Sequence, residues 1–282
     1  MAPLPRVTIL GAGRMGQGLA LALRPSDVTL VGRRAHRVAA PLRLHPGPRA
    51  EAVARGALLI LAVPDDAVTP LAADLAAEGS VTADHMVLHL SGLLDRRALS
   101  PLGATGAGLG SFHPLQTIAD PLVASERLAG AYAGLEGDDR ALAAGARLAD
   151  ALAMVPVRLS AAAKPAYHAG AAMVANYTTA LIAVAERLAQ AAGVSPETAA
   201  RLYLPLLRGT AANLDAGPVA ALTGPVRRGD VRTIRAHLAV LSGEDARLYR
   251  LLGVEALRLA RQAGLPPELA DRVAEALHER GE

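Results

Sequence analysis

The stretch RVTILGAGRMGQGLALAL, residues 6–23, decides how the first half of the chain folds. The β-branched run at its start predicts a short strand, and the apolar run at its end predicts a helix, so the order is strand, glycine turn, helix. Gly11, Gly13 and Gly16 form a GxGxxG pattern between the two. In that pattern the first glycine permits a tight turn, the second lets the backbone approach a pyrophosphate, and the third lets helix and strand pack closely.

The start of this helix is therefore a candidate dinucleotide site. The helix N-terminus faces the phosphates in such a fold, because its free N–H groups and dipole attract anions. We expect the three glycines, with Arg14 and Met15 between them, to contact the cofactor. The alternative is a glycine turn without a ligand, but the strand and helix that the motif requires are both present.

Two arginines follow the second expected strand, VTLV at 28–31. An NAD-binding fold places an acidic residue for the ribose hydroxyls here, roughly twenty residues after the glycines. This chain has Arg33 and Arg34 instead. A guanidinium binds a 2′-phosphate with paired hydrogen bonds whereas a carboxylate repels it, so NADP(H) is favoured over NAD. Alternatively, both arginines are solvated loop residues.

Later segments continue the parallel α/β pattern of a doubly wound Rossmann domain. Further strands are expected at 57–63, 86–91, 131–136 and 154–160, with a helix over 140–152. Residues 108–117 are expected to form another strand and its exit loop. Ligands of an open parallel sheet lie beyond the carboxyl ends of its strands. This nominates, as neighbours of the cofactor, Val63, Pro64, Asp65, Ser91 and Gly92.

The pattern changes after residue 160, so we expect an NADP-binding domain over 1–160 and a helical domain for substrate and dimerisation over 161–282. Helices are expected at 165–192, 196–214, 230–241, 244–263 and 267–279. The helical half is long and alanine-rich, which favours a homodimer across its apolar faces.

Lys164 is the only lysine among 29 lysines and arginines, and Pro165 after it predicts a helix start. The positive end of a helix dipole disfavours a cation, so this position invites an anionic partner such as a substrate carboxylate or a developing oxyanion. The same field, with burial, would lower the pKa of the lysine toward that of a general acid. His168 follows one turn later on nearly the same face, so the two are a candidate catalytic pair. The alternative is a solvent-facing lysine beside a structurally bonded histidine.

Three further residues are candidate substrate contacts. His113 follows a strand, where a buried, hydrogen-bonded histidine is an equally good interpretation. Asn176 lies twelve residues after Lys164, about 18 Å along a helix, so the two meet one substrate only if the helix bends. Asp230 ends ALTGPVRRGD, residues 221–230, and is best interpreted as a helix cap. With the two arginines before it, it could instead bind substrate or shape a subunit interface.

Composition excludes several classes of function. The net charge is +3 with scattered arginines, and only 2% of residues are aromatic, which argues against nucleic acid. There is no cysteine, so disulfides and thiolate metal sites are excluded, and we expect no metal. No apolar run approaches the ~20 residues that span a bilayer, and MAPLPRVTIL lacks the layout of a signal peptide. A cytoplasmic protein without membrane contact is expected.

ILGAGRMG, followed by a parallel sheet and helices, resembles the superfamily of hydroxyisobutyrate and phosphogluconate dehydrogenases, ketopantoate reductase and pyrroline-carboxylate reductase. SFHPLQT, KPAYHAGAAMVANY and ALTGPVRRGD more closely resemble Rossmann-like oxidoreductases with a C-terminal domain of unknown function. Among the characterised relatives, the hydroxy-acid dehydrogenases and ketopantoate reductase have a lysine at the start of the interdomain helix and an asparagine four residues later. Here the second residue is His168.

The resemblance implies that Lys164 protonates a ketone oxygen as hydride arrives from the nicotinamide, while His168 orients the substrate or relays a proton. The leading hypothesis is an NADP-dependent oxidoreductase that reduces a small carboxylate-bearing ketone, such as ketopantoate or another 2-oxo acid. Reduction of a cyclic imine, as in pyrroline-carboxylate reductase, is the second hypothesis. A non-catalytic protein that senses NADP is the third.

Overall fold

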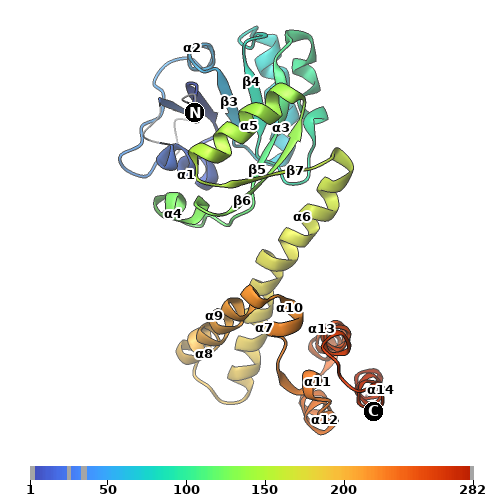
Figure 1. The fold of residues 1–282 in the computed structure, drawn as a ribbon. Helices are drawn as coiled ribbons and strands as arrows, with labels where there is room; N and C mark the ends of the chain where they lie inside the picture. The colour runs from blue at the N-terminus through green and yellow to red at the C-terminus, as the bar shows by residue number, and fades with distance from the viewer. Residues whose placement is uncertain (1–3, 24–26, 33–36, 280–282) are drawn as a thin grey trace. The chain divides into compact units, whose positions relative to one another are not determined.

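The computed structural model describes residues 4–23, 27–32 and 37–279 (Figure 1). They form two compact units, Met1–Asn176 and Tyr177–Glu282. The first unit extends beyond the change of sequence pattern near residue 160. The reason is local, since side chains from the first turn of the following helix hydrogen-bond to the sheet.

A seven-stranded sheet forms the centre of the first unit, in the order β2-β1-β3-β4-β5-β6-β7. Its strands are β1 (Val7–Leu10), β2 (Val28–Val31), β3 (Leu58–Leu61), β4 (Met86–His89), β5 (Gly108–Pro114), β6 (Tyr132–Gly137) and β7 (Val155–Arg158). All seven strands were expected, and the Rossmann-like α/β class is confirmed. The order places β1 between β2 and β3, so the glycine turn after it lies where the direction of winding reverses.

The sheet is not entirely parallel, which corrects one expectation. Strands β5 and β6 pair antiparallel, with Pro114 opposite Ala133, whereas every other pair is parallel. A parallel pair needs a crossover, usually an α-helix, that returns the chain to the other end of the sheet. The connection after β5 holds only the short helices η2 (Pro121–Val123) and α4 (Ala124–Leu128). The chain therefore starts β6 at the same end at which β5 finished.

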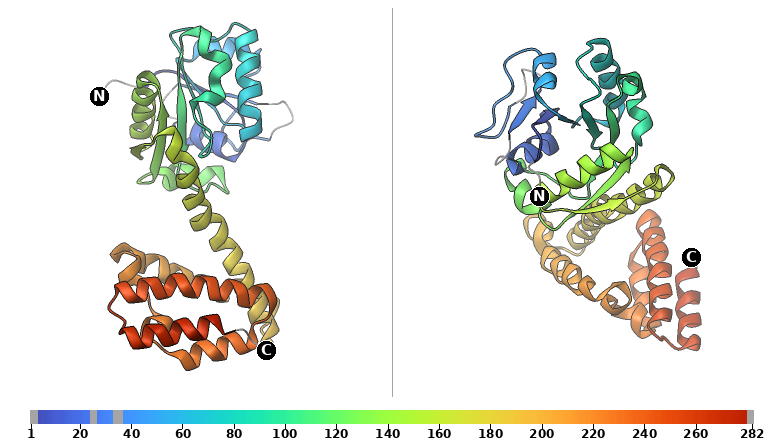
Figure 2. Two further views of the ribbon diagram at one scale, coloured as in Figure 1. Left: turned by 90° about the vertical axis from the view of Figure 1, so that its right-hand side faces the viewer. Right: turned by 45° about the horizontal axis from the view of Figure 1, so that its top comes forward.

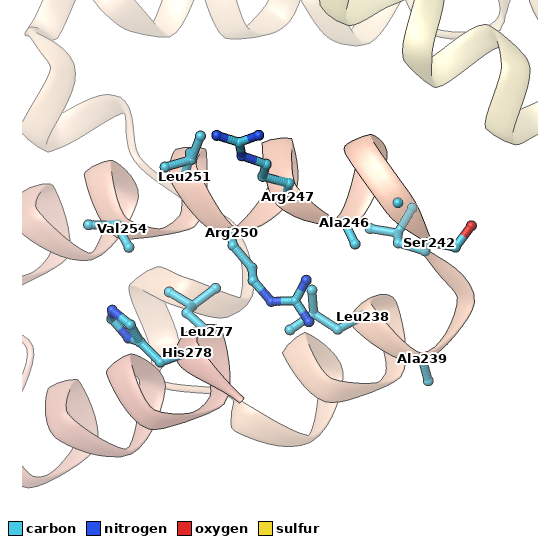
Figure 3. Close-up of a pocket in the computed structure, with 12 residues that line it drawn as sticks. Leu238, Ala239, Ser242, Ala246, Arg247, Arg250, Leu251, Val254, Leu277 and His278 are labelled. Atoms are coloured by element: carbon cyan, nitrogen blue, oxygen red, sulfur yellow. The ribbon is translucent and has the colours of Figure 1, made fainter. Parts of the chain in front are cut away.

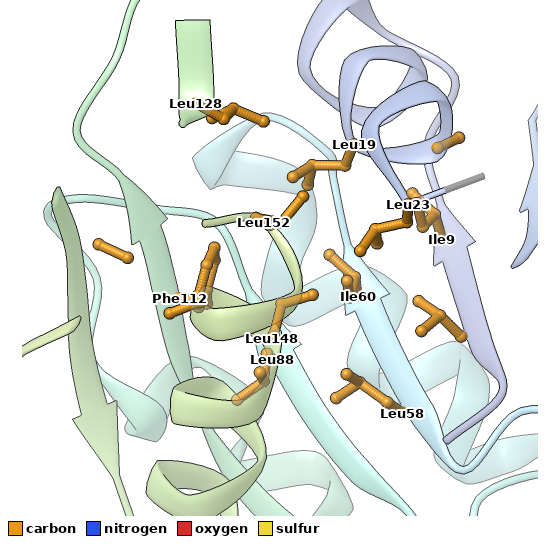
Figure 4. Close-up of a cluster of buried hydrophobic side chains, with 14 of the residues drawn as sticks. Ile9, Leu19, Leu23, Leu58, Ile60, Leu88, Phe112, Leu128, Leu148 and Leu152 are labelled. Carbon is orange, nitrogen blue, oxygen red and sulfur yellow. The ribbon is translucent and has the colours of Figure 1, made fainter. Parts of the chain in front are cut away.

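Helices cover both faces of the sheet (Figures 1 and 2). One face packs against α1 (Arg14–Ala22), α4 and α5 (Asp139–Ala151), in a core that includes Leu19, Ile60, Phe112 and Leu148 (Figure 4). The other face packs against α2 (Arg49–Arg55), α3 (Asp65–Ala77) and η1 (Arg96–Thr105). Successive residues of a strand point to opposite faces, which is why the fully buried run Leu58–Leu61 supplies both cores.

The expected helix over 165–192 is interrupted. After η3 (Ala161–Ala163), α6 (Lys164–Ala172) passes into a π-helical turn, Met173–Tyr177, before α7 (Thr178–Ala191). The two compact units divide within this turn. Short π segments inside α-helices occur frequently at functional sites.

The second unit is entirely helical in its described residues, as expected. After α7 its elements are α8 (Pro196–Leu202), α9 (Leu204–Asn213), η5 (Leu214–Ala216), α10 (Pro218–Ala221), α11 (Gly224–Arg228), α12 (Val231–Val240), α13 (Gly243–Gln262) and α14 (Pro267–His278). Ile234, Leu257 and Val273 belong to its buried core. No helix in the described part of the chain is long and apolar enough to cross a membrane.

Candidate nucleotide and substrate site

The glycine turn is as tight as the motif predicts. Gly11 has φ +126°, and a Cβ on it would lie 2.2 Å from the backbone oxygen of Ala62. A Cβ on Gly16 would lie 2.0 Å from the carbonyl oxygen of Gly11. Gly13 has no heavy atom within 4 Å of its Cβ position. The first and third glycines are therefore required by packing, and the second leaves open space.

Helix α1 begins just after this open space. Gly13 is its N-cap and offers no side-chain hydrogen bond to the first turn, so the N–H groups there are available to an anion. Gly13 and Arg14 are exposed. This arrangement fits the pyrophosphate of a dinucleotide, because backbone donors face a space that no side chain fills.

Three adjoining cavities follow the carboxyl edge of the sheet. The nucleotide cavity, of about 560 Å³, is lined by Gly11, Gly13, Gly32, Val63 and Pro64 among others. The central cavity, of about 240 Å³, shares Val63 and Ala62 with it. The helix cavity, of about 770 Å³, shares His113 and Gln116 with the central cavity. Together they reach from the glycine turn to the end of α6.

The central cavity contains part of a polar network. Ser91 Oγ donates to Asp65 Oδ2 at 2.7 Å and accepts from the N–H groups of Leu93 and Leu94. Asp65, Ser91 and His113 all line this cavity, with Met15 on the side of the glycine turn. The expected neighbours of a cofactor at the ends of β3 and β4 are thus brought together.

The expected contact of Gly92 with a cofactor stays a prediction. Gly92 is buried and lines none of the three cavities described above. A Cβ on it would lie 2.4 Å from His168 Nδ1 and 2.9 Å from His113 Nε2. Gly92 therefore gives two histidine rings the space to approach β4.

Arg33 and Arg34 lie outside the described residues. Gly32, directly before them, lines the nucleotide cavity together with Arg49. Arg49 is paired with Glu78, and its Nη2 lies 3.7 Å from Asp74 Oδ2. Its charge is therefore compensated by two carboxylates. Binding of a 2′-phosphate by Arg33 and Arg34 stays a prediction.

Lys164 is fully buried, with 0% of its surface exposed. Its Nζ donates to the carbonyl oxygen of Ser91 at 3.0 Å and to Ser111 Oγ at 2.8 Å, so it links α6 to β4 and β5. Burial lowers the pKa of the ammonium, while the carboxylates of Glu136, Asp95 and Asp65 act in the opposite direction. The lysine lines none of the three cavities, and its role as general acid stays a prediction.

The buried ammonium makes the stability of the protein depend on pH. The folded pKa is below the ordinary lysine value of 10.5, so between those two values the unfolded chain binds more protons, and the stability contributed by this site rises with pH. Lys164→Met removes the charge and keeps the length of the side chain. We expect wild type to gain stability relative to this variant between pH 7 and 10, measured by urea unfolding. A difference that does not change with pH would contradict it.

His113, Tyr167 and His168 meet at the entrance to the helix cavity. His113 Nδ1 lies 2.9 Å from Tyr167 Oη, and its ring meets that of His168 edge to face with centroids 5.5 Å apart. Burial, with smaller contributions from His168 and Lys164, lowers the pKa of His113 to about 4 against the opposing effect of Asp65. His168 Nδ1 is buried without a hydrogen-bond partner. His113 therefore stands in the site beside His168, and the convergence of Lys164 and His168 on one small molecule stays a prediction.

The two remaining candidates, Asn176 and Asp230, belong to different compact units. Asn176 is exposed in the π-helical turn and lines the helix cavity. Asp230 caps α12 in the second unit, where its carboxylate accepts from the N–H and Oγ1 of Thr233 at 3.1 and 2.7 Å. The capping interpretation is confirmed, and residues Gly224–Arg228 of ALTGPVRRGD form the short helix α11. Binding of substrate by Asp230 stays a prediction.

Sequence reasoning missed Tyr167, Ser111 and Glu136. Tyr167 had a signal, because it lies three residues after Lys164 and adjacent to His168 on the same helix. Ser111 and Glu136 belong to strands far away in sequence, and nothing in their local pattern marks them. Glu136 is buried, accepts from the N–H of Arg96 at 2.7 Å, and has its pKa raised by burial.

The helical unit has a cavity of its own, of about 800 Å³, between α12, α13 and α14 (Figure 3). Leu238, Leu251 and Leu277 line it together with Arg247 and Arg250. Arg250 donates to the carbonyl oxygen of Glu279 at 3.1 Å, and Arg247 lies 3.8 Å from Glu244. Both guanidinium groups thus already contact acceptors, and no phosphate-binding turn adjoins this cavity.

Solved structures share this fold at low sequence identity. A Thermotoga maritima protein is 21% identical, with a TM-score of 0.67 over 91% of this chain and 98% of its own. Pyrroline carboxylate reductase of Plasmodium falciparum, solved with NADP bound, is 11% identical, with a TM-score of 0.60 over 96% and 98%. A Streptomyces aurantiacus imine reductase is 19% identical, with a TM-score of 0.52 over 97% and 93%. No protein of curated function matches the sequence significantly.

Two family models match the chain in succession. Residues 2–114 match a Rossmann-like domain, which covers the sheet as far as the end of β5. Residues 131–256 match a domain of unknown function (DUF2520), which begins at the antiparallel strand β6. The chain therefore joins a Rossmann-like domain to the domain of unknown function DUF2520.

Proposed function

We propose that this protein is an NADP-dependent reductase that transfers hydride to a C=O or C=N bond of a small molecule. One observation supports this above all others, namely the line of three adjoining cavities from the glycine turn to the His113–Tyr167 pair. A dinucleotide extends along that edge in a Rossmann-like fold. The NADP bound to one of the similar structures supports the choice of cofactor.

Each cavity has a separate task under this proposal. The glycine turn and the N-terminus of α1 hold the pyrophosphate, and Arg33 and Arg34 bind the 2′-phosphate. The bound cofactor supplies a hydride at the central cavity, beside Ser91 and His113. The helix cavity holds the substrate. Its lining is mostly apolar, and it places the polar groups of Tyr167 and Asn176 around the substrate.

A carboxylate-bearing ketone is the first substrate class, as the sequence predicts. Lys164 is the cation close to the central cavity, since it bonds the backbone of Ser91, which lines that cavity. Its field would attract a 2-oxo acid. Under this hypothesis Lys164 is the general acid, and a small displacement of Ser91 or Ser111 would free one of its protons.

A cyclic imine is the second class, and a specific observation favours it. The carboxylate of Asp65 lines the central cavity, where it would stabilise a protonated imine and oppose a substrate carboxylate. The names of two similar structures, a pyrroline carboxylate reductase and an imine reductase, point the same way. Oxidation of cyclic amines, but not of hydroxy acids, with NADP would decide for the imine.

The cofactor is the first part of this proposal to test. Purified protein is titrated with NADPH and NADH, and the titration is repeated with Arg33 and Arg34 both changed to Ala. We expect tight NADPH binding that falls to the NADH level in the double variant, because the paired guanidinium groups are lost. Arg43→Ala is the matched control, an exposed arginine of the same connection, and it should bind NADPH as wild type does.

Other outcomes of the titration have definite meanings. If neither nucleotide binds, the reductase proposal is wrong. If NADPH binds equally well to the double variant, the arginines do not select the cofactor. Binding of NADP and NADPH with different affinities, without turnover of any oxo acid or imine, would favour the non-catalytic NADP sensor.

A further inference from the structure

The ring of Tyr167 packs against the sheet at Gly134, a residue without a side chain. A Cβ on Gly134 of β6 would lie 2.9 Å from Tyr167 Oη and 3.1 Å from its Cζ. The ring meets that of His113 edge to face, with centroids 5.5 Å apart and an angle of 87° between the planes. The phenol therefore packs against the paired residues Gly134 of β6 and His113 of β5, where Gly134 has no side chain that would displace it.

The two groups have complementary protonation states at neutral pH. Burial raises the pKa of Tyr167 above its ordinary value of 10, so the phenol keeps its proton. Burial lowers the pKa of His113 to about 4, assisted by His168 and Lys164 and opposed by Asp65, so the imidazole is neutral. A neutral imidazole carries one N–H, and at Nδ1 that hydrogen would point at Tyr167 Oη. The phenolic proton would then be free to point elsewhere.

Tyr167 and His113 also lie where the helix cavity meets the central cavity. Tyr167 and His113 both line the helix cavity, and His113 lines the central cavity as well. A substrate in the helix cavity therefore contacts the phenol while its reacting carbon approaches the central cavity. Lys164 is fully buried and has two of its three hydrogens already bonded.

We propose that Tyr167 is the proton donor of the reduction and that His113 is the residue that positions its hydroxyl. The inference rests on the proposed function, because NADPH is the source of the hydride. The hydride brings two electrons to the carbon of the C=O or C=N bond, and the π electrons of that bond move to the oxygen or nitrogen. That atom takes the proton from Tyr167 Oη. The Nδ1–H of His113 stabilises the resulting phenolate, which recovers a proton from water.

The first test needs no substrate. Nitrogen-15 NMR of the histidine rings in the NADP complex reports which ring nitrogen of His113 carries hydrogen. We expect the neutral tautomer with hydrogen on Nδ1 at pH 7, and we expect its resonance to shift in Tyr167→Phe. Hydrogen on Nε2 alone would mean that Tyr167 donates its proton to His113, which would overturn the assignment.

The second test measures turnover with two probes, glyoxylate as an oxo acid and 1-pyrroline as an imine. Tyr167→Phe should lower kcat by about 10²- to 10⁴-fold, the usual contribution of a positioned acid, with the Kd for NADPH unchanged. Tyr132→Phe is the matched control, since Tyr132 is a tyrosine of β6 that is 53% exposed, and it should keep the wild-type kcat. Full kcat in Tyr167→Phe would overturn the proposal.

The positioning role of His113 has its own readout. The amide nitrogen of His113→Asn can take the place of Nδ1, so this variant should keep more kcat than His113→Leu, with similar KM in both. Equal losses would show that the histidine acts only through packing. If wild type binds NADPH but reduces neither probe, the proposed function is wrong for these substrate classes. In that case the NMR measurement of the His113 tautomer alone tests whether His113 donates its Nδ1 hydrogen to Tyr167 Oη.

Discussion

Gly16→Ala is expected to destabilise the protein by about 3 kcal/mol or more, at the upper end of what overpacking costs. The new Cβ would lie 2.0 Å from the carbonyl oxygen of Gly11 and 3.2 Å from the Cβ of Ala62. Two of its three nearest atoms belong to backbone, so relief requires α1 to move away from the sheet. Urea unfolding followed by circular dichroism measures the loss. An unchanged free energy of unfolding would contradict the close packing described above.

Gly13→Ala should weaken nucleotide binding without changing the stability of the fold. Its Cβ would enter open space, so the free energy of unfolding should change by no more than about 0.5 kcal/mol. The same methyl group would occupy the approach to the pyrophosphate, so NADPH should bind at least about tenfold more weakly, or ~1.4 kcal/mol. Gly103→Ala, also exposed with open space around it, should change neither quantity. Wild-type NADPH affinity in Gly13→Ala would show that the turn does not hold the cofactor.

The glycine turn was predictable because strand, turn and helix follow one another within residues 6–23. The contact of Gly16 with the carbonyl oxygen of Gly11 is local to the motif, whereas the contact of Gly11 with Ala62, beyond β3, is not. The direction of β6 was not predicted, since it depends on where the chain is after β5. The connection contains only the short helices η2 and α4, which do not return the chain to the other end of the sheet. The amino-acid composition of the connection does not show how short these helices are.

Helix breaks were predicted unevenly for a similar reason. The apolar period continues through 173–177, so the π-helical turn there left no trace in the pattern. The sequence does contain a signal for the break between α8 and α9 at Tyr203, although one continuous helix was expected over 196–214. Proline at 205 disfavours helical backbone in the residue before it, and it lies near the start of α9.

The site shows how far one unusual residue can lead. Lys164 attracts notice because no other lysine exists in the sequence. In the structure its Nζ donates to the carbonyl oxygen of Ser91, just beyond the end of β4. Its partners could not be derived, because Ser111 is 53 residues away in sequence. Lys164 is completely buried, whereas Tyr167, about one turn further along the same helix, lines the helix cavity.

Acid is expected to destabilise the first unit through His89, which is fully buried at the end of β4. Its Nδ1 accepts from the N–H of Ser91 at 3.2 Å, and its Nε2 lies 3.1 Å from the carbonyl oxygen of Asp95. Both contacts are made by the neutral ring. Burial lowers the pKa of His89 from 6.5 to about 4, so a proton enters the unfolded chain more readily than the folded one.

The sign and the size of this effect follow from linkage. Between pH 6.5 and 4 the unfolded state binds more protons, so stability falls as pH falls across that interval and levels off below it. At 1.36 kcal/mol for each pKa unit, the loss due to His89 is about 3 kcal/mol. His89→Gln keeps an acceptor and a donor without a titrating ring. Urea unfolding from pH 7 to 4 should therefore show a smaller decrease for this variant than for wild type. His45→Gln, which changes a partly exposed histidine of the same unit, should decrease as wild type does. Equal decreases in wild type and His89→Gln would mean that the ring is not held neutral, and that the fold does not depend on the hydrogen bond from the N–H of Ser91 to His89 Nδ1.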